Sequence, residues 1–325
     1  MLRLSRRDAA LSMLKFNIPS RMRLIHIVGA RPNFMKLAPV QRALTSIEKI
    51  EQIVVHTGQH YDVNMSDVFF QQLKIKALDI NLQVGSGSHA KQTAEIMLRF
   101  EQIVLHHRPD LVLVYGEMNS TVSAALVCAK LLVPVAHVEA GLRSGDRSMP
   151  EEINRLMTDQ LSDLLFTPSS DGNLTLEREG ISTDKIHLIG NVMIDTLTTM
   201  LPAAQSRLPR DIPSRFALVT LHRPSNVDDL CWLKHMLQAL EHFSKDLAVI
   251  FPVHPRTRQR IHEVGMNGTT SALKLIDPLP YLAFVALQQR ATVVITDSGG
   301  HSRGNHVPWH SALNSPQKYG TPHYG

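Results

Sequence analysis

The stretch that decides the fold is PVAHVEAGLRSGDRSMPEEINR, residues 134–155. An apolar strand predicted at 133–138 ends directly before Glu139. A glycine turn and a polar loop follow, and then a helix opens with Glu151 and Glu152 in its first turn. In open α/β sheets, ligands bind where strands end and helices begin. Acids also favour a helix N-terminus, which is the alternative interpretation of Glu151 and Glu152. Glu139 resists that interpretation, because a structural carboxylate directly after an apolar strand is unusual.

The same strand, loop and helix pattern recurs on both sides of this stretch. Apolar strands are predicted at 24–28, 53–56, 111–115, 164–166 and 186–188, and again at 217–220, 247–251, 273–276 and 293–296. Strands of this length that alternate with helices predict parallel, doubly wound sheets. A connection is predicted at 190–195, before a Pro-rich polar segment, so we place a domain boundary near Asp195. The chain is therefore predicted to be an α/β protein with two Rossmann-like domains, 22–195 and 196–300.

Length and composition limit the classes of function. A chain of 325 residues with 43% apolar residues fits two globular domains with substantial cores. The net charge of +5 is compatible with nucleic-acid binding, but only 5% of the residues are aromatic and no basic stripe carries interleaved aromatics. A cationic cleft for a small anionic substrate explains this charge equally well. Cys128 and Cys231 lie in apolar helical settings and indicate reduced core residues of a cytoplasmic protein. No run of about 18 apolar residues is present, so no membrane span is predicted.

Two further strand ends carry candidate residues. After the first strand, a tight Gly-Ala turn leads into a helix with Arg31 and Lys36 near its start. Free N–H groups and the positive end of the helix dipole favour an anion there, although both residues could simply be solvated cations. The strand at 111–115 ends at Glu117, and the polar residues 119–121 are predicted to cap the next helix.

Several motifs in one order carry a resemblance. Besides residues 134–155, they are GARPNFMKLAPV (29–40), TGQHYDVNMSD (57–67), GNVMID (190–195), TLHRPSNVDD (220–229), FPVHPRT (251–257) and TDSGG (296–300). Together they resemble the non-hydrolysing UDP-N-acetylglucosamine 2-epimerases over about residues 22–300. So many motifs in one order are specific, whereas any one alone would not be.

The resemblance implies a fold, a reaction and partners. The fold is glycosyltransferase-B-like, with a cleft between two Rossmann-like domains. The reaction interconverts UDP-N-acetylglucosamine (UDP-GlcNAc) and UDP-N-acetylmannosamine (UDP-ManNAc) by anti elimination of UDP and its re-addition on the opposite face. This route needs an acid or base on each face of the sugar and cations for the leaving diphosphate. It needs no redox cofactor and no metal, and the family suggests a homodimer that binds neither nucleic acid nor membrane.

The resemblance also implies roles for individual residues. By matching motif, the catalytic candidates are Glu117, Glu139, Glu151 and His222, and the substrate-binding candidates are Arg31, Lys36, Gln59, Phe284, Ser298, Gly299 and Gly300. Arg31, Lys36 and His222 would lie near the diphosphate, Phe284 near the uracil, and the Ser-Gly-Gly amides on a phosphate. His222 could instead be a structural histidine. One departure concerns Glu117, where the family usually has Asp, because a reach longer by one methylene can misplace the carboxylate.

The two ends of the chain depart from the resemblance. Residues 1–21 have no counterpart, and Met22 directly precedes the first strand, so we expect either a start at Met22 or a disordered extension. Residues 301–325 lack any apolar period, and their histidines, with no carboxylate or Cys beside them, do not make a convincing metal site. Shifting the codon phase by one base lets this tail read Ile-Gln-Glu-Glu at its start and Thr-Glu-Arg-Pro later, which restores the family pattern.

We therefore interpret the tail as a one-base phase error and the second domain as incomplete. The predicted function is that of a UDP-GlcNAc 2-epimerase, with little or no activity in the chain as printed. The alternatives are an inactive, truncated nucleotide-sugar binder and a sugar transferase of glycosyltransferase-B-like fold. The sequence does not identify the pathway that would use the product.

Overall fold

The computed structural model describes residues 21–58, 73, 75, 78–209, 211–221, 224–265 and 272–297, except for the side chains of Arg31, Pro224 and Ser225. The chain divides into two compact units between Thr199 and Met200. Helix α8 (Val192–Gln205) runs through that division and also through the predicted boundary near Asp195. The connection predicted at 190–195 is therefore wrong from Val192 onward, where the chain is already helical.

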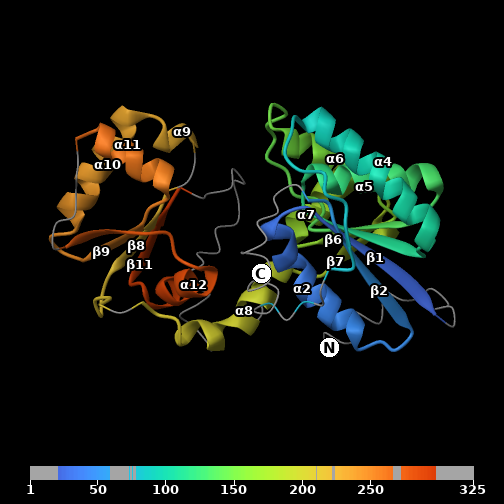
Figure 1. The fold of residues 1–325 in the computed structure, drawn as a ribbon, viewed down its shortest axis with the longest axis horizontal. Coiled ribbons are helices and arrows are strands. Elements are labelled where there is room, and N and C mark those ends of the chain that lie inside the picture. Colours follow the sequence, from blue (N-terminus) through green and yellow to red (C-terminus); the bar gives the residue numbers. More distant parts are fainter. Residues whose placement is uncertain are drawn as a thin grey trace. The chain divides into compact units, whose positions relative to one another are not determined.

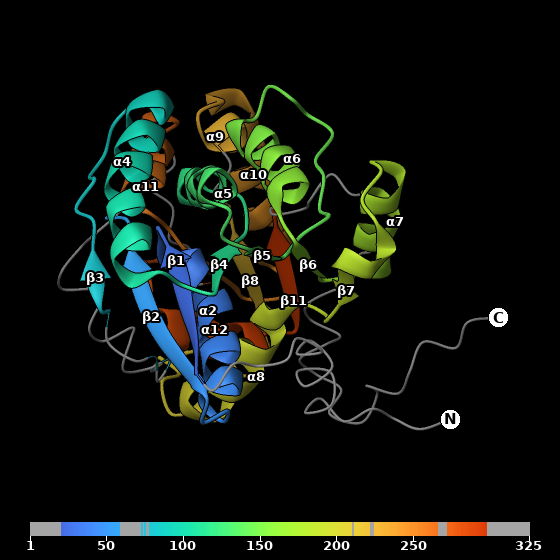
Figure 2. The ribbon, with the colours of Figure 1, turned by 90° about the vertical axis from the view of Figure 1, so that its right-hand side faces the viewer.

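The first unit is built on a seven-stranded parallel sheet with the order β3-β2-β1-β4-β5-β6-β7. Its strands are β1 (Met22–Val28), β2 (Ile50–His56), β3 (Ile80–Asn81), β4 (Leu111–Tyr115), β5 (Val135–Val138), β6 (Leu164–Thr167) and β7 (Ile186–Leu188). Its helical elements are α2 (Arg31–Thr45), α4 (His89–His107), α5 (Asn119–Leu131), α6 (Pro150–Leu161), α7 (Ser170–Arg178) and the 3₁₀ turn η1 (Thr183–Lys185). Helices α4, α5 and α6 cover one face of the sheet, and α2 lies on the other (Figures 1 and 2).

Burial explains why these strands form. Every residue of β5 is buried, and β1 and β4 are buried along most of their length, as expected for parallel strands covered by helices on both faces. The main core lies between this sheet and helices α4 and α5, where Ile27, Phe100 and Val114 pack together. Helix α4 begins at His89 because the Ser88 hydroxyl accepts the Lys91 N–H.

The second unit carries a four-stranded parallel sheet with the order β10-β9-β8-β11. Its elements are β8 (Ala217–Thr220), α9 (Pro224–Val227), α10 (Leu230–Phe243), β9 (Val249–Pro252), α11 (Pro255–Glu263), β10 (Leu273–Ile276), α12 (Tyr281–Arg290) and β11 (Val293–Thr296). A core of Leu233, Leu237 and Phe251 joins α10 to the sheet. The prediction of parallel α/β sheets is confirmed in both units.

The predicted cap of helix α5 is also wrong. Residues 119–121 do not cap helix α5 with a side chain, because the capping position is Met118 and Asn119 is already helical. The Asn119 amide instead bonds to His89 and Gln92 of helix α4 and to Asn154 of helix α6. These partners lie about 30 residues away on either side, so no local pattern announced them.

Candidate functional site

Two carboxylates extend from neighbouring strand ends of the first unit. Strands β4 and β5 are paired, with Tyr115 opposite Val138, so Gly116–Glu117 and Glu139 leave the same edge of the sheet. The Gly116 N–H donates to the Val138 carbonyl oxygen at 3.0 Å, which ties the two exits together. The structure thus brings Glu117 and Glu139 together, as the strand pattern predicts.

Lys36 of helix α2 connects these carboxylates. Its ammonium forms an ion pair with Glu139 Oε2 and lies 3.9 Å from Glu117 Oε2. Lys36 is only 5% exposed, so its charge is stabilised mainly by these anionic partners. The sequence alternative of a solvated cation is therefore wrong for Lys36.

The backbone at this cluster is unusual. Gly116 has φ of +65°, and a Cβ added there would lie 2.6 Å from Lys36 Nζ and 3.3 Å from Glu139 Oε2. Glu139 itself has φ of +78°, a left-handed conformation that a residue with a side chain rarely adopts. Strained backbone of this kind is maintained at functional sites by its surroundings. Position 116 therefore favours glycine, both for its conformation and for its closeness to Lys36.

The two acids of the first turn of α6 behave differently. Glu152 is buried, and its carboxylate accepts the N–H groups of Ser144 and Gly145 at 2.9 and 3.0 Å. Burial alone would raise the pKa of Glu152, but these bonds outweigh it and hold the pKa below its usual value. The Glu151 side chain is half-buried and makes no hydrogen bond or ion pair with the described part of the chain. Glu152 therefore fixes the loop before α6, while Glu151 keeps a carboxylate available for chemistry.

Helix α6 supplies two site residues that the sequence analysis did not assign. Arg155 Nη2 lies 3.6 Å from Glu117 Oε1, and its Nη1 lies 3.1 Å from Glu152 Oε2. The Asn154 amide donates to the Glu117 carbonyl oxygen at 3.0 Å. The available signal was the helical spacing, because Arg155 comes one turn after Glu151 and therefore lies on the same face.

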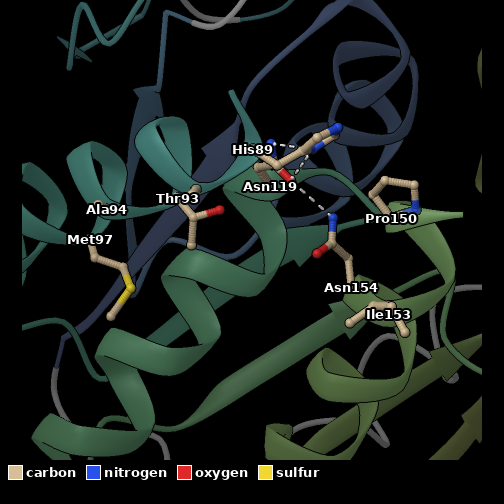
Figure 3. Close-up of a pocket in the computed structure, with 9 residues that line it drawn as sticks. His89, Thr93, Ala94, Met97, Asn119, Pro150, Ile153 and Asn154 are labelled. Carbon is tan, nitrogen blue, oxygen red and sulfur yellow. Dashed lines mark hydrogen bonds between the residues drawn. The ribbon is translucent and has the colours of Figure 1, made fainter. Parts of the chain in front are cut away.

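A pocket of about 450 Å³ lies where helices α4, α5 and α6 begin (Figure 3). His89, Asn119 and Asn154 form its polar side, and Thr93, Met97 and Ile153 line the remainder. None of the predicted site residues lines it. Its relation to the carboxylate cluster is indirect, through the bond from Asn154 to the Glu117 backbone.

The other predicted site residues are less informative. Gln59, His222, Ser298, Gly299, Gly300 and the side chain of Arg31 lie outside the described residues. Phe284 of helix α12 is half-buried and packs against the core cluster of Phe216, Leu218 and Ile250 in the second unit. That packing gives Phe284 a structural role, with part of the ring still accessible to a ligand.

Two absences apply within the described ranges. No group of three or more His, Cys, Asp or Glu side chains there could hold a metal ion. Among the helices described, none is long and apolar enough to cross a membrane.

Comparison with known proteins gives a consistent result. The family model described as UDP-N-acetylglucosamine 2-epimerase matches residues 42–302. A "UDP-N-acetylglucosamine 2-epimerase homolog" of Methanococcus maripaludis is 43% identical over 290 residues, which is 86% of this chain and 79% of that protein. The "UDP-2,3-diacetamido-2,3-dideoxy-D-glucuronate 2-epimerase" of Pseudomonas aeruginosa is 42% identical over 282 residues, with the same coverage of 86% and 79%.

The solved structures agree. The crystal structure of Methanocaldococcus jannaschii UDP-GlcNAc 2-epimerase in complex with UDP-GlcNAc and UDP superposes with a TM-score of 0.73 at 39% identity. The match covers 86% of this chain and 80% of that one. The predicted fold class, two Rossmann-like parts of the glycosyltransferase-B-like kind, is confirmed by this likeness.

Proposed function

Because the chain belongs to the UDP-N-acetylglucosamine 2-epimerase family, we propose that it inverts C2 of UDP-GlcNAc to form UDP-ManNAc, and the reverse. The observation that carries this proposal, beyond the family, is the cluster in which Lys36 contacts both Glu117 and Glu139. An ammonium between two carboxylates offsets their mutual repulsion, so the two acids can lie close together at one edge of the sheet.

The reaction requires proton transfer at a carbon that is only weakly acidic. Elimination of UDP removes the C2 proton and breaks the bond from C1 to the diphosphate oxygen, which gives 2-acetamidoglucal and UDP. Addition of UDP then returns a proton to the other face of C2. We assign Glu117, Glu139 and Glu151 as the acid and base groups. Helix α6 supports this assignment, because Arg155 lies beside Glu117 and Glu151 lies one turn before it.

The leaving diphosphate needs cations and backbone donors. We assign this role to Arg31, Lys36 and His222, with Ser298, Gly299 and Gly300 on a phosphate, Gln59 as a further substrate contact and Phe284 beside the uracil. Lys36 would then serve two groups, since its ammonium already pairs with Glu139 and an arriving diphosphate would compete for it. Such competition would release Glu139 as a base when substrate binds.

The identity of the sugar has a second candidate. The Pseudomonas aeruginosa relative named for a diacetamido uronate is 42% identical, close to the 43% of the Methanococcus maripaludis relative. Both names describe inversion at C2, so the same carboxylates would serve either substrate. Equal amounts of the two nucleotide sugars, offered together, would show which is consumed first.

The decisive experiment is exchange with solvent. The frame-restored chain is incubated with UDP-GlcNAc in D₂O, and the product is examined by mass spectrometry and proton NMR. Deuterium at C2 with formation of UDP-ManNAc supports the epimerase. Tight binding without exchange would mean a non-catalytic binder, and transfer of the sugar to an acceptor without exchange would mean a transferase.

We also propose that residues 301–325 arise from a phase error and that the second domain of the printed chain is incomplete. The tail lies outside the described residues, so support comes from the sequence, whose shifted reading restores Gln-Glu-Glu and Thr-Glu-Arg-Pro segments. Resequencing around codon 300 tests this directly. The homodimer is a proposal as well, supported by Leu98 and Leu105, which are 64% and 52% exposed and seven residues apart on α4. Light scattering would measure it.

A cytoplasmic location is the last part of this proposal. Neither Cys128 nor Cys231 forms a disulfide, which supports a reducing compartment. Cys128 is buried as predicted, but Cys231 is exposed, so the prediction of a core residue is wrong for Cys231. Fractionation of the producing cells would test it.

A further inference from the structure

His137 is a fully buried histidine whose two ring nitrogens both face acceptors. Its Nε2 lies 2.8 Å from the Gly116 carbonyl oxygen, and its Nδ1 lies 2.6 Å from Asp159 Oδ1. A carbonyl oxygen can only accept, so Nε2 must carry a proton. An ionised carboxylate also only accepts, so Nδ1 must carry a proton as well whenever Asp159 is charged.

The surroundings keep Asp159 charged. Its Oδ2 accepts the Gly141 N–H at 3.1 Å and lies 2.7 Å from Arg143 Nη1. Burial alone would raise the pKa of Asp159, but its contacts outweigh burial and lower that pKa. The Arg143 guanidinium and the Gly141 N–H favour the carboxylate whatever the charge of His137. With a carboxylate at Asp159, both ring nitrogens of His137 are donors and the ring is an imidazolium.

The charges continue outward in alternating sign. Arg143 also forms a two-pronged pair with Glu179 of the α7 C-terminus, with contacts of 2.9 and 2.6 Å. The result is a row of four alternating charges, with two cations, His137 and Arg143, and two anions, Asp159 and Glu179, so that its net charge is zero. A row of charges in which each one has an opposite neighbour can be buried without a large uncompensated desolvation penalty.

This row of charges contacts every segment that carries a proposed acid or base. His137 holds the carbonyl of Gly116, directly before Glu117. Asp159 holds the amide of Gly141, two residues after Glu139, and itself belongs to helix α6, which carries Glu151 in its first turn. Glu139 has a left-handed backbone conformation, which persists in a residue with a side chain only where neighbouring groups hold it.

We propose that His137 is a positioning residue of the epimerase site, held as a buried imidazolium by Asp159, and that it fixes the strand ends bearing Glu117 and Glu139 relative to helix α6. The positioning role rests on the proposed function, whereas the protonation state does not. His137 touches none of the three carboxylates through its own side chain in the contacts described, so it acts through the backbone that carries them.

The protonation state is tested in the 325-residue chain labelled with ¹⁵N-histidine. At about pH 8.5 exposed histidines have lost their second proton. We expect His137 alone among the buried, assigned histidines to retain protons on both ring nitrogens, with assignment by loss of its signals in His137→Asn or His137→Gln. Asp159→Asn should leave only the Nε2 proton, because the asparagine amide can donate to Nδ1. A single ring proton on His137 in the unaltered chain overturns the proposal, whatever the activity.

The positioning role is tested by hydrogen exchange and kinetics. Exchange at the Gly141 amide should rise at least about tenfold in Asp159→Ala, which removes the acceptor of that amide, but not in His26→Ala. His26 is equally buried and its ring bonds Tyr115 and Gln52 side chains instead of a strand-end loop. Unchanged Gly141 exchange in Asp159→Ala would refute the positioning role even in a protein without epimerase activity.

The kinetic arm uses the frame-restored chain and a matched carboxylate. Asp159→Asn should lower kcat on the order of ten- to a hundredfold, with KM within about threefold, because misplaced acid and base groups slow chemistry more than binding. Asp163→Asn is the control, since Asp163 holds the Val135 amide at the opposite end of strand β5. Equal losses in the two variants, or a rise in KM alone, would show a merely structural role. If the unaltered frame-restored chain has no activity, the proposed function fails, while the ring protons and Gly141 exchange still decide this inference.

Discussion

Replacing Gly116 by alanine would test the core of the proposed site. The backbone there has φ of +65°, and alanine in this region costs roughly 1 kcal/mol. The added Cβ would also lie 2.6 Å from Lys36 Nζ, so the buried ammonium must shift by several tenths of an ångström among its carboxylate partners. Removing one partner of a buried pair costs about 3–5 kcal/mol, and displacement should cost less, about 1–3 kcal/mol. We therefore expect Gly116→Ala to lower the free energy of unfolding by about 2–4 kcal/mol.

Gly180→Ala is the matched control for backbone strain. Gly180 has φ of +84°, but an added Cβ would meet nothing within 4 Å. Urea unfolding should therefore give a loss of only about 1 kcal/mol for Gly180→Ala. In a Lys36→Ala background, the loss from Gly116→Ala should fall toward the same value, because the nearest clashing atom is gone and only the milder 3.3 Å approach to Glu139 Oε2 remains. If Gly116→Ala and Gly180→Ala are equally destabilising when Lys36 is present, the close approach of Lys36 to Gly116 is wrong.

Four other outcomes are expected. The stability that Glu152 contributes should be present above its unfolded pKa near 4.5 and should be lost as the pH falls through its lower folded pKa. The difference in unfolding free energy between the unaltered chain and Glu152→Gln should therefore shrink between pH 7 and pH 3. A difference that grows on acidification would contradict the buried, hydrogen-bonded carboxylate. Burial raises the pKa of Cys128 to about 12, whereas Cys231 is exposed, so a thiol reagent at pH 8 should modify one cysteine quickly in the folded protein and both in denaturant; two fast thiols would argue against this core. Glu151→Gln should reduce kcat of the frame-restored chain by about 10²–10⁴-fold with little change in melting temperature, and a loss of stability without a loss of rate would reassign Glu151 to structure. The printed 325-residue chain should show little or no epimerase activity beside its frame-restored version, and comparable rates would remove the phase-error interpretation.

The fold was predictable because its strands are continuous apolar runs. Strand β5 is wholly buried, and a short apolar run of this kind between turn residues and helices is typical of a buried parallel strand. The placement of Glu117 and Glu139 followed from the same pattern, since the carboxyl ends of parallel strands share one edge.

Contacts over long sequence separation were not predictable in this way. Lys36 lies 103 residues before Glu139, and no local pattern specifies their ion pair. Asn119 is a residue type that often caps helices. Its side chain instead forms hydrogen bonds with His89, Gln92 and Asn154, which are far away in the sequence. In the sequence His137 is one more residue of an apolar strand. Its role depends on the acceptors of its two ring nitrogens, which only the structure gives.

The burial of the Lys36 cluster has a consequence for ionic strength. Dissolved ions screen exposed charges over about 10 Å at 0.1 M salt, but they reach buried pairs much less. Pairs such as Arg99–Glu95 and Arg256–Asp228, whose side chains are well exposed, should therefore weaken as salt is added. The pair between Lys36 and Glu139 has side chains only 6% and 14% exposed and should persist. Concentrated salt would thus loosen the charged surface of this chain while leaving Glu139 paired with Lys36 at the end of its strand.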